Sequence, residues 1–213
     1  MLKLYGYFRS SATYRVRIAL NLKGIPYETV PVHLVQGEQR APGYLAVNPA
    51  GLVPALDDHG RIITQSLAIV EYLDELHPRP PVLPGAAADR ARIRAIALAV
   101  ACEIHPLNNQ SVLRYLTDTL GIDPAAKDAW YCHWVEKGLA TVERLLADDR
   151  RTGAFCHGDT PTLADCCLVP QVFNAQRFAC RLDRVPTVMG IYDQCMALEA
   201  FQRAAPGNQP DAA

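Results

Sequence analysis

The sequence lacks the features that mark several large classes of protein. No stretch of its 213 residues approaches the ~18 consecutive apolar residues of a membrane span, and no run of five like charges occurs. Lys and Arg number 21 against 22 Asp and Glu, a balance that disfavours nucleic acid or an anionic membrane surface as a partner. The first residues lack the basic and apolar stretches of an export signal, so we expect a cytoplasmic protein.

Cysteine is absent from the first 101 residues of the chain. All seven cysteines lie at Cys102 or beyond, and no C-x-x-C pair occurs. An odd number of cysteines in a chain without an export signal predicts free thiols. Cys and His stand side by side at 132–133 and 156–157, which is not the spacing of zinc ligands, so no metal site is expected. Residues 1–101 therefore offer no thiol of their own as a nucleophile or redox centre.

Familiar catalytic fingerprints are also missing. The chain contains no G-x-S-x-G, no P-loop and no dinucleotide-binding glycine pattern, which removes the corresponding enzyme classes from consideration. It does contain enough apolar side chains, 50% of its residues, to bury roughly 70% of its unfolded surface in an ordinary globular core.

The N-terminal part alternates strand and helix patterns. The predicted elements are strands at 2–8 and 27–34, a helix at 11–23, a hairpin within 52–64 and a helix from Ser66. A strand, a helix and a second strand in succession predict a parallel strand pair. Up to residue 77 the predicted order is β-α-β-α-β-β-α.

Four prolines within residues 77–85 separate this part from the rest. Beyond them the periodicity predicts helices only, at 88–119, 124–148, 162–178 and 185–197. The predicted fold is thus an α/β domain, residues 1–80, joined to an all-helical domain, residues 88–213. We expect the polar tail 205–213 to be frayed.

Two strand-to-helix junctions carry serine. Arg9, Ser10 and Ser11 precede or open the first helix, and Gln65 and Ser66 stand at the start of a later one. A helix N-terminus attracts anions through its unpaired N–H groups and its dipole, and a serine hydroxyl there can donate to a thiolate or carboxylate. The alternative at each junction is a plain N-cap.

Val53 and Pro54 enter the hairpin between these junctions. A cis bond would turn the Val53 backbone groups outward to pair with an extended peptide, whereas an ordinary edge-strand proline would not. Two anion-binding helix N-termini beside such a strand would form a binding site for a small anionic peptide.

The helical part contains two kinds of polar signal. Thr162 and Asp165 form a capping box, which we interpret as a folding signal. His105 and Asn109 interrupt a long helical stretch, and Arg177 ends another. These three are either solvated surface residues or, if they face a cleft, groups that bind a carboxylate.

Four segments carry a resemblance to zeta-class glutathione transferases: FRSSATYRVRIAL (8–20), NP..LVPAL (48–56), QSLAIVEYL (65–73) and GDTPTLADCCLVPQV (158–172). The similarity covers nearly the whole chain and is closest to bacterial maleylacetoacetate and maleylpyruvate isomerases. It implies a thioredoxin-like N-terminal domain, an all-helical C-terminal domain, a homodimer and glutathione as cofactor. The implied activity is the isomerisation of a maleyl diketo acid, maleylacetoacetate, in tyrosine and phenylalanine catabolism.

The resemblance also implies roles for individual residues. Ser10 and Ser11 would stabilise the glutathione sulfur, with Arg9 adding positive charge and Arg177 completing the catalytic set. Glutathione would be held by Ser10, Ser11, Ala12, Gln39, Val53, Pro54, Gln65, Ser66 and Asn109. The substrate would be held by Arg9, His105, Asn109, Gln110 and Arg177.

This sequence departs from the family pattern in two places. Ala12 stands where the family usually has a cysteine, so activity that depends on that thiol should be missing. Gln110 and Ser111 stand where some maleylpyruvate-directed members have basic residues. The second departure favours maleylacetoacetate as the substrate.

Three functions are consistent with these residues. The first is glutathione-dependent cis–trans isomerisation of maleylacetoacetate, with maleylpyruvate as the alternative substrate. The second is a glutathione transferase or dehalogenase acting on small α-haloacids, which would consume glutathione in step with product. The third is a binding module that keeps the glutathione-binding site but has no catalytic activity.

Overall fold

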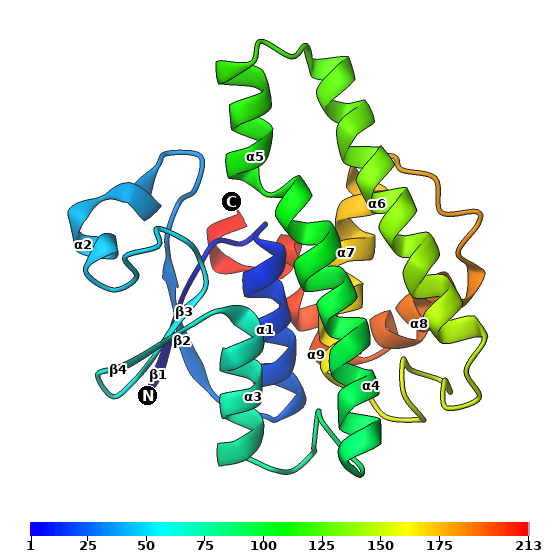
Figure 1. Cartoon of the computed structure of the whole chain (residues 1–213). Helices are drawn as coiled ribbons and strands as arrows, with labels where there is room; N and C mark the ends of the chain where they lie inside the picture. Colours follow the sequence, from blue (N-terminus) through cyan, green and yellow to red (C-terminus); the bar gives the residue numbers. More distant parts are fainter. Residues whose placement is uncertain (213) are drawn as a thin grey trace. The chain divides into compact units, whose positions relative to one another are not determined.

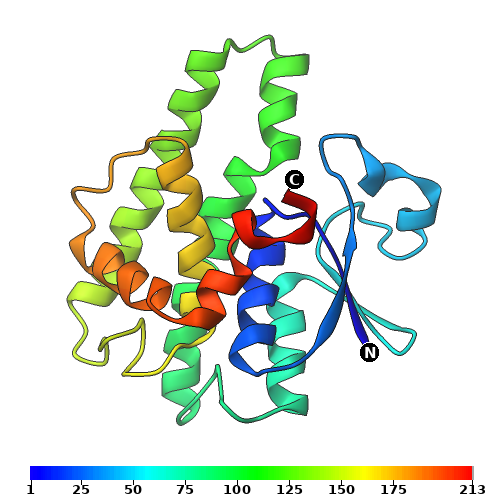
Figure 2. The same cartoon turned by 180° about the vertical axis from the view of Figure 1, so that it is seen from behind.

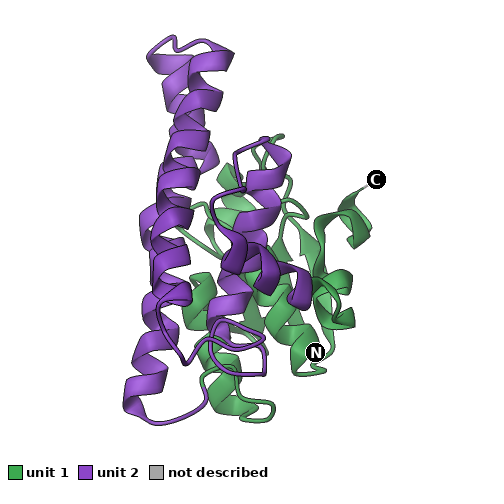
Figure 3. Ribbon diagram, turned by 90° about the vertical axis from the view of Figure 1, so that its right-hand side faces the viewer, with its two compact units in different colours: residues 1–83, 196–213 green, residues 84–195 purple. Residues whose placement is uncertain are grey.

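The computed structural model describes residues 1–212, which form two compact units (Figures 1 and 3). The first comprises Met1–Leu83 together with the end of the chain from Met196, and the second comprises Pro84–Cys195. The structure thus differs from the predicted division at 88–213, because the last segment of the chain packs with the first unit. None of the described helices is long and apolar enough to cross a membrane.

The first unit has the element order predicted from the sequence. Its elements are β1 (Leu2–Gly6), α1 (Ser11–Leu22), β2 (Tyr27–Pro31), α2 (Pro42–Leu45), β3 (Ala55–Asp58), β4 (Arg61–Thr64) and α3 (Ser66–Leu76), with a 3-10 turn at Glu38–Arg40. The sheet order is β2-β1-β3-β4. β1 is parallel to β2 and antiparallel to β3, and β3 pairs with β4 as a hairpin. α1 and α3 pack together on one face of the sheet, and α2 lies on the other side (Figure 1).

α1 is the central helix of this unit. Val16, Ile18 and Leu20 are fully buried, which stabilises the helix by removing apolar area from water. The end of β1 approaches the first turn of α1 so closely that a Cβ on Gly6 would lie 2.3 Å from Thr13 Cγ2. A glycine is therefore needed where the strand passes the helix.

The described part of the C-terminal segment is ordered against α1, so the expectation of a frayed tail was wrong for residues 205–212, and Ala213 lies outside the described residues. α9 (Glu199–Ala204) packs along α1 (Figure 2). Arg17 Nε donates to the Ala204 carbonyl at 2.9 Å, and the Phe8 N–H donates to Asp211 Oδ2 at 2.9 Å. Buried Gln209 donates to two carbonyls of the preceding turns. Polar side chains that bond to distant backbone leave no periodic signal in the sequence.

The second unit is helical, as predicted. Its main helices are α4 (Ala87–Leu98), α5 (Gln110–Arg114), α6 (Pro124–Ala147), α7 (Leu163–Arg177) and α8 (Pro186–Met196). The single helix predicted at 88–119 is divided by π-helical turns at Ala99–Ile104 and Tyr115–Thr119 and a 3-10 turn at His105–Asn108. The predicted capping box is present at the start of α7, where the Thr162 N–H and hydroxyl both donate to Asp165 at 2.7 Å.

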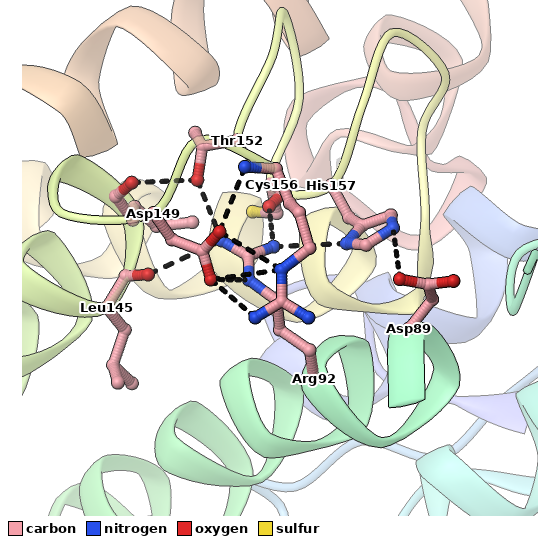
Figure 4. A network of polar contacts seen from close by, with 9 residues as sticks. Asp89, Arg92, Leu145, Asp149, Thr152, Cys156 and His157 are labelled. Carbon is pink, nitrogen blue, oxygen red and sulfur yellow. Dashed lines mark hydrogen bonds and ion pairs between the residues drawn. The ribbon is translucent and has the colours of Figure 1, made fainter. Parts of the chain in front are cut away.

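Arg92 on α4 is the centre of a polar network in this unit (Figure 4). Its side chain is 8% exposed, and each of its three nitrogens donates a hydrogen bond. The acceptors are Asp149 Oδ2, Thr152 Oγ1 and the carbonyls of Leu145 and Cys156, with His157 Nδ1 at 3.2 Å. The network fastens the loop after α6 to α4.

Candidate functional site

The N-terminus of α1 has the serine arrangement that the sequence suggested. Ser10 is the N-cap, and its Oγ accepts the Thr13 N–H at 3.2 Å. The capping interpretation is therefore correct, but a hydroxyl has one donor and two acceptor sites, so capping leaves its proton free to donate to an anion. Ser11 is 6% exposed. Ala12 follows it in the first turn of the helix.

Arg9 precedes this cap at the surface. Its Nη2 donates to Tyr7 Oη at 2.9 Å, and its guanidinium lies over the rings of Tyr7 and Phe8. These contacts hold the Arg9 side chain against the two residues before it, in the loop that precedes α1. Arg9 thus supplies positive charge close to the Ser10 cap.

The N-terminus of α3 differs because no side chain caps it. Gln65, the residue before the helix, has φ +68° and makes no side-chain capping bond. Non-glycine residues adopt such a backbone at a cost and are enriched at functional sites. The first turn contains no acidic side chain, so its N–H groups and dipole are available to an anion.

Arg15 on α1 adds positive charge behind this helix terminus. It is 3% exposed, and its Nη1 donates to Ser66 Oγ at 3.2 Å. Among the described residues its Nε and Nη2 have no hydrogen-bond partner, and it forms no ion pair. A buried charge without a carboxylate is costly unless an anion lies nearby. Sequence reasoning overlooked Arg15, although an arginine inside the apolar helix pattern is itself a signal.

The loop before β3 places the Val53 backbone next to the start of β3, the strand that pairs with β1 and β4. Leu52 O accepts from Tyr44 Oη and from Asn48 Nδ2, both at 2.6 Å. Burial raises the pKa of Tyr44 to about 12, so this phenol keeps its proton as a donor. The Val53–Pro54 bond is cis. Val53 lies beyond the residues of β3 that pair with β1 and β4.

Gln39 belongs to the 3-10 turn and is 8% exposed. Its Oε1 has no hydrogen-bond partner among the described residues. Arg15 joins Ser66 to α1 through a hydrogen bond, whereas no hydrogen bond within the described residues joins the Gln39 side chain to either helix terminus.

Four of the five predicted substrate-side residues lie in the second unit, whereas Arg9 lies in the first. Asn109 is the N-cap of α5 and accepts from the N–H and hydroxyl of Ser111, and Gln110 is the first residue of that helix. His105 opens the 3-10 turn. Arg177, the last residue of α7, is exposed and lies over the Phe178 ring at 4.8 Å. Asn108, which sequence reasoning overlooked, has buried amide atoms that make no hydrogen bond within residues 1–212.

A metal centre finds no support in the part of the chain that the structure describes. Within it, no group of three or more His, Cys, Asp or Glu side chains could hold an ion. The candidate residues of each unit thus offer helix termini, hydroxyls, amides and guanidinium groups.

Sequence comparison matches both parts of this architecture. Residues 1–75 match the glutathione S-transferase N-terminal domain, and residues 135–189 match the glutathione S-transferase C-terminal domain. The four-stranded sheet, the serine-capped helix and the helical second unit thus define a protein of glutathione S-transferase type.

Individual relatives narrow the class. The chain is 49% identical over 212 residues to a maleylpyruvate isomerase of a Ralstonia species, covering 100% of both chains. It is 51% identical over 203 residues to the maleylacetoacetate isomerase of Rhizobium meliloti, covering 95% of each. The solved holo structure of a maleylpyruvate isomerase, described as a bacterial zeta-class glutathione transferase, has a TM-score of 0.97 at 49% identity, covering 99% of this chain and 100% of that one.

A maleylacetoacetate isomerase of Methylobacterium extorquens, solved with bound malonate and glutathione, has a TM-score of 0.96 at 42% identity and 99% coverage of both chains. The chain belongs to the zeta class of the glutathione S-transferase family.

Proposed function

We propose that this protein is a glutathione-dependent isomerase that converts maleylacetoacetate to fumarylacetoacetate. The observation that carries the proposal is the uncapped start of α3, with Gln65 in a left-handed backbone and the unneutralised guanidinium of Arg15 behind Ser66. That arrangement fits an amino-acid end that carries a carboxylate, as the γ-glutamyl part of glutathione does. The first unit also contains no cysteine, so it supplies no reacting thiol of its own beside these helix termini.

The residues of the first unit hold and activate the cofactor in this proposal. Glutathione, when bound, supplies a thiol that adds reversibly to a double bond conjugated to a carbonyl and so permits rotation about it. The Ser10 hydroxyl donates to the sulfur and, with Ser11 and the α1 dipole, lowers the pKa of the thiol. Arg9 adds positive charge beside it. Gln65 and Ser66 bind the γ-glutamyl end.

Three further residues complete the proposed cofactor site. The Val53 backbone, ahead of Pro54, pairs with the cysteinyl unit, Gln39 receives the glycyl end, and Ala12 lies beside the sulfur without contributing a thiol. These contacts resemble the addition of a short strand to a sheet edge.

The residues of the second unit, together with Arg9 of the first, hold the substrate. Arg177 binds a substrate carboxylate, because an exposed guanidinium recognises that group through paired hydrogen bonds. His105, Asn109 and Gln110 bind the remaining polar groups and the carbonyl oxygen that gains charge during addition. Asn109 also contacts glutathione.

A parallel assay tests the activity. Isomerisation of maleylacetoacetate and of maleylpyruvate is followed with and without glutathione, while total glutathione is measured. We expect turnover of maleylacetoacetate that requires glutathione and leaves its concentration unchanged. Stoichiometric loss of glutathione with an α-haloacid would instead indicate a transferase or dehalogenase. Binding of glutathione without turnover of either maleyl compound would indicate a binding module.

Maleylpyruvate is the second candidate substrate. It is favoured by the 49% identity to the Ralstonia maleylpyruvate isomerase, which is close to the 51% identity to the maleylacetoacetate isomerase of Rhizobium meliloti. The neutral residues at 110 and 111 favour maleylacetoacetate. The ratio of kcat/KM for the two compounds decides between them.

Arg177→Ala tests the substrate-side assignment. We expect the KM for the maleyl substrate to rise about tenfold or more, since a charge-assisted hydrogen bond is worth about 1.5–3 kcal/mol. Glutathione affinity, measured by calorimetry, should not change. An equal loss of affinity for both compounds would show that Arg177 is not a substrate-binding residue.

We further propose that the enzyme is a cytoplasmic homodimer. The seven free cysteines favour a reducing compartment, and the family resemblance favours the dimer. Sedimentation of the purified protein against its 23.4 kDa chain mass tests the assembly, and fractionation of the source cells tests the location.

A further inference from the structure

Two thiols of the second unit are in contact, although 48 positions separate them in the sequence. Cys132 Sγ lies 2.8 Å from Cys180 Sγ. Cys132 is half-buried on α6, and Cys180, 7% exposed, lies just beyond α7. A disulfide bond is about 2.0 Å long. The two sulfur atoms would therefore reach bonding distance if they moved less than about 1 Å closer together.

The backbone on the Cys180 side is fixed by the way α7 ends. The Cys180 N–H donates to Ala175 O and the Ala179 N–H donates to Gln176 O, both at 3.0 Å. Ala179 has φ +51°. These are the two bonds of a Schellman cap, which closes a helix through one left-handed residue. The cap determines where Cys180 lies at the end of α7.

The next residue ties this turn to α6. Arg181 donates to Glu136 from its N–H at 2.9 Å, from Nε at 3.0 Å and from Nη2 at 2.6 Å. Glu136 lies four positions after Cys132, on the same face of α6. The salt bridge therefore holds the Cys180 turn against the face that carries Cys132.

A third contact lies on the other side of the cysteine pair. The Phe178 ring stacks on Tyr131 with centroids 3.7 Å apart and planes 16° from parallel, and the Cys132 thiol donates to Phe178 O at 3.4 Å. Contacts at 131 and 136 thus bracket Cys132, while contacts at 178 and 181 bracket Cys180. The thiols are held together by the fold rather than by chance proximity.

A cavity of about 330 Å³ opens beside α6 at this point, lined by Ala129, Cys132, His133, Glu136, Lys137 and Arg181. Cys132 faces it, and Cys180 is not among the lining residues. The Lys137 ammonium lies 4.9 Å from the Trp134 ring centre and adds positive charge for an anionic reagent. Because Cys132 lines the cavity and Cys180 is 7% exposed, Cys132 is the thiol that an incoming reagent meets first. Burial also raises the pKa of the Cys180 thiol.

We propose that Cys132 and Cys180 form a disulfide when the protein encounters a low-molecular-weight disulfide such as glutathione disulfide. The Cys132 thiolate attacks one sulfur of the reagent and releases one thiolate. The Cys180 thiol then loses its proton and attacks Cys132 Sγ, which releases the second. Two protein thiols are oxidised, one reagent disulfide is reduced to two thiols, and the two protons end on those thiols. This proposal goes beyond the proposed function and does not depend on it.

Peptide mapping of the full chain tests the proposal. The protein is incubated with glutathione disulfide, its remaining thiols are blocked with N-ethylmaleimide, and it is digested with trypsin without reduction. Cleavage after Lys and Arg places Cys132 in peptide 128–137 and Cys180 in peptide 178–181. We expect these two peptides to be linked, the link to disappear on reduction, and the free-thiol count to fall by two per chain.

Variants sharpen the test. Cys132→Ser and Cys180→Ser should each abolish the link, whereas Cys102→Ser, at an exposed cysteine, should leave it intact. Recovery of wild-type Cys132 with glutathione attached while Cys180 carries the blocking group would overturn the proposal. Recovery of both cysteines as blocked thiols would do the same. The wild-type map decides the question even if a serine variant fails to fold.

Discussion

Arg15 and Arg92 are both buried arginines on a helix of their own unit, but their surroundings differ. All three Arg92 nitrogens donate hydrogen bonds, and its Nε lies 2.8 Å from Asp149 Oδ2. Arg15 makes one bond, to Ser66 Oγ, and its other two nitrogens have no partner among the described residues. The same side chain is thus fully satisfied in one unit and largely unsatisfied in the other.

The difference separates a residue that supports the fold from one that supports binding. A buried arginine whose nitrogens all donate hydrogen bonds stabilises the elements that it joins. Its loss leaves the acceptors on those elements without a donor. An unneutralised one costs the empty protein free energy that an anionic ligand can recover. Arg15 lies behind the uncapped start of α3, where the proposed site receives a carboxylate. The same substitution at the two positions should therefore have opposite consequences.

Arg92→Met should have the largest effect on stability. It leaves Thr152 and the carbonyls of Leu145 and Cys156 without their donor, and we expect the free energy of unfolding to fall by about 3 kcal/mol. Urea unfolding measures this change. The glutathione affinity of the remaining folded protein should equal that of the wild type. A loss below 1 kcal/mol, on the order of one ordinary hydrogen bond, would contradict the role assigned to the network.

Arg15→Met should leave stability within about 1 kcal/mol of the wild type, because an apolar side chain of similar length replaces an incompletely paired charge. We expect the dissociation constant for glutathione to rise about tenfold, which corresponds to about 1.4 kcal/mol. Calorimetric titration and urea unfolding together give both values. A fall in stability as large as that of Arg92→Met would remove the distinction between the two arginines.

Ser66→Ala should weaken glutathione binding about fivefold, since it removes one hydrogen-bonding group worth about 1 kcal/mol. Leu67 and Ala68 follow in the helix and offer no hydroxyl that could replace it. Thr64→Ala, just before the helix, serves as the matched control and should bind glutathione normally. Equal effects of the two variants would argue against a specific role for the Ser66 hydroxyl.

The smallest expected change in stability comes from substituting Glu136, which forms a salt bridge with Arg181. The Arg181 side chain is 71% exposed. The hydrogen bond from Arg181 lowers the pKa of Glu136 below its ordinary value of 4.5. A lowered carboxyl pKa contributes stability that is present above that ordinary value and is lost as the pH falls through the folded-state pKa. Glu136→Gln should therefore cost less than about 1 kcal/mol at neutral pH.

The cost of Glu136→Gln should shrink as the pH falls below the ordinary range of a glutamate. Urea unfolding of both proteins across the acid range checks this. A difference that stays constant with pH would mean that the charge of Glu136 makes no contribution.

Local pattern was enough to predict much of the first unit. The alternation of strand and helix signals located β1, α1, the β3–β4 hairpin and the start of α3 within a few residues, because each depends on its own side-chain period and turn residues. The serine at the start of α1 was predicted both as a cap and as an anion-binding group. Its hydroxyl caps the helix, and its role towards a ligand stays a prediction.

What the sequence could not predict depends on contacts between distant residues. That Arg15 makes only one hydrogen bond, to Ser66, can be known only once the fold places α3 beside α1. The Arg92 network likewise forms only because the loop after α6 returns to α4. The π-helical turns at 99–104 and 115–119 interrupt a segment whose apolar period looked continuous. The contact between Cys132 and Cys180 is another result of tertiary packing.

The bond from Phe8 to Asp211 has a consequence for how the chain is made. It joins residues 203 positions apart within the first unit, and α9 covers α1 in the same unit. A ribosome delivers β1 and α1 long before this covering segment. The α/β unit can reach its final packing only after the whole helical unit has been synthesised, so a growing chain must keep α1 partly uncovered until α9 emerges.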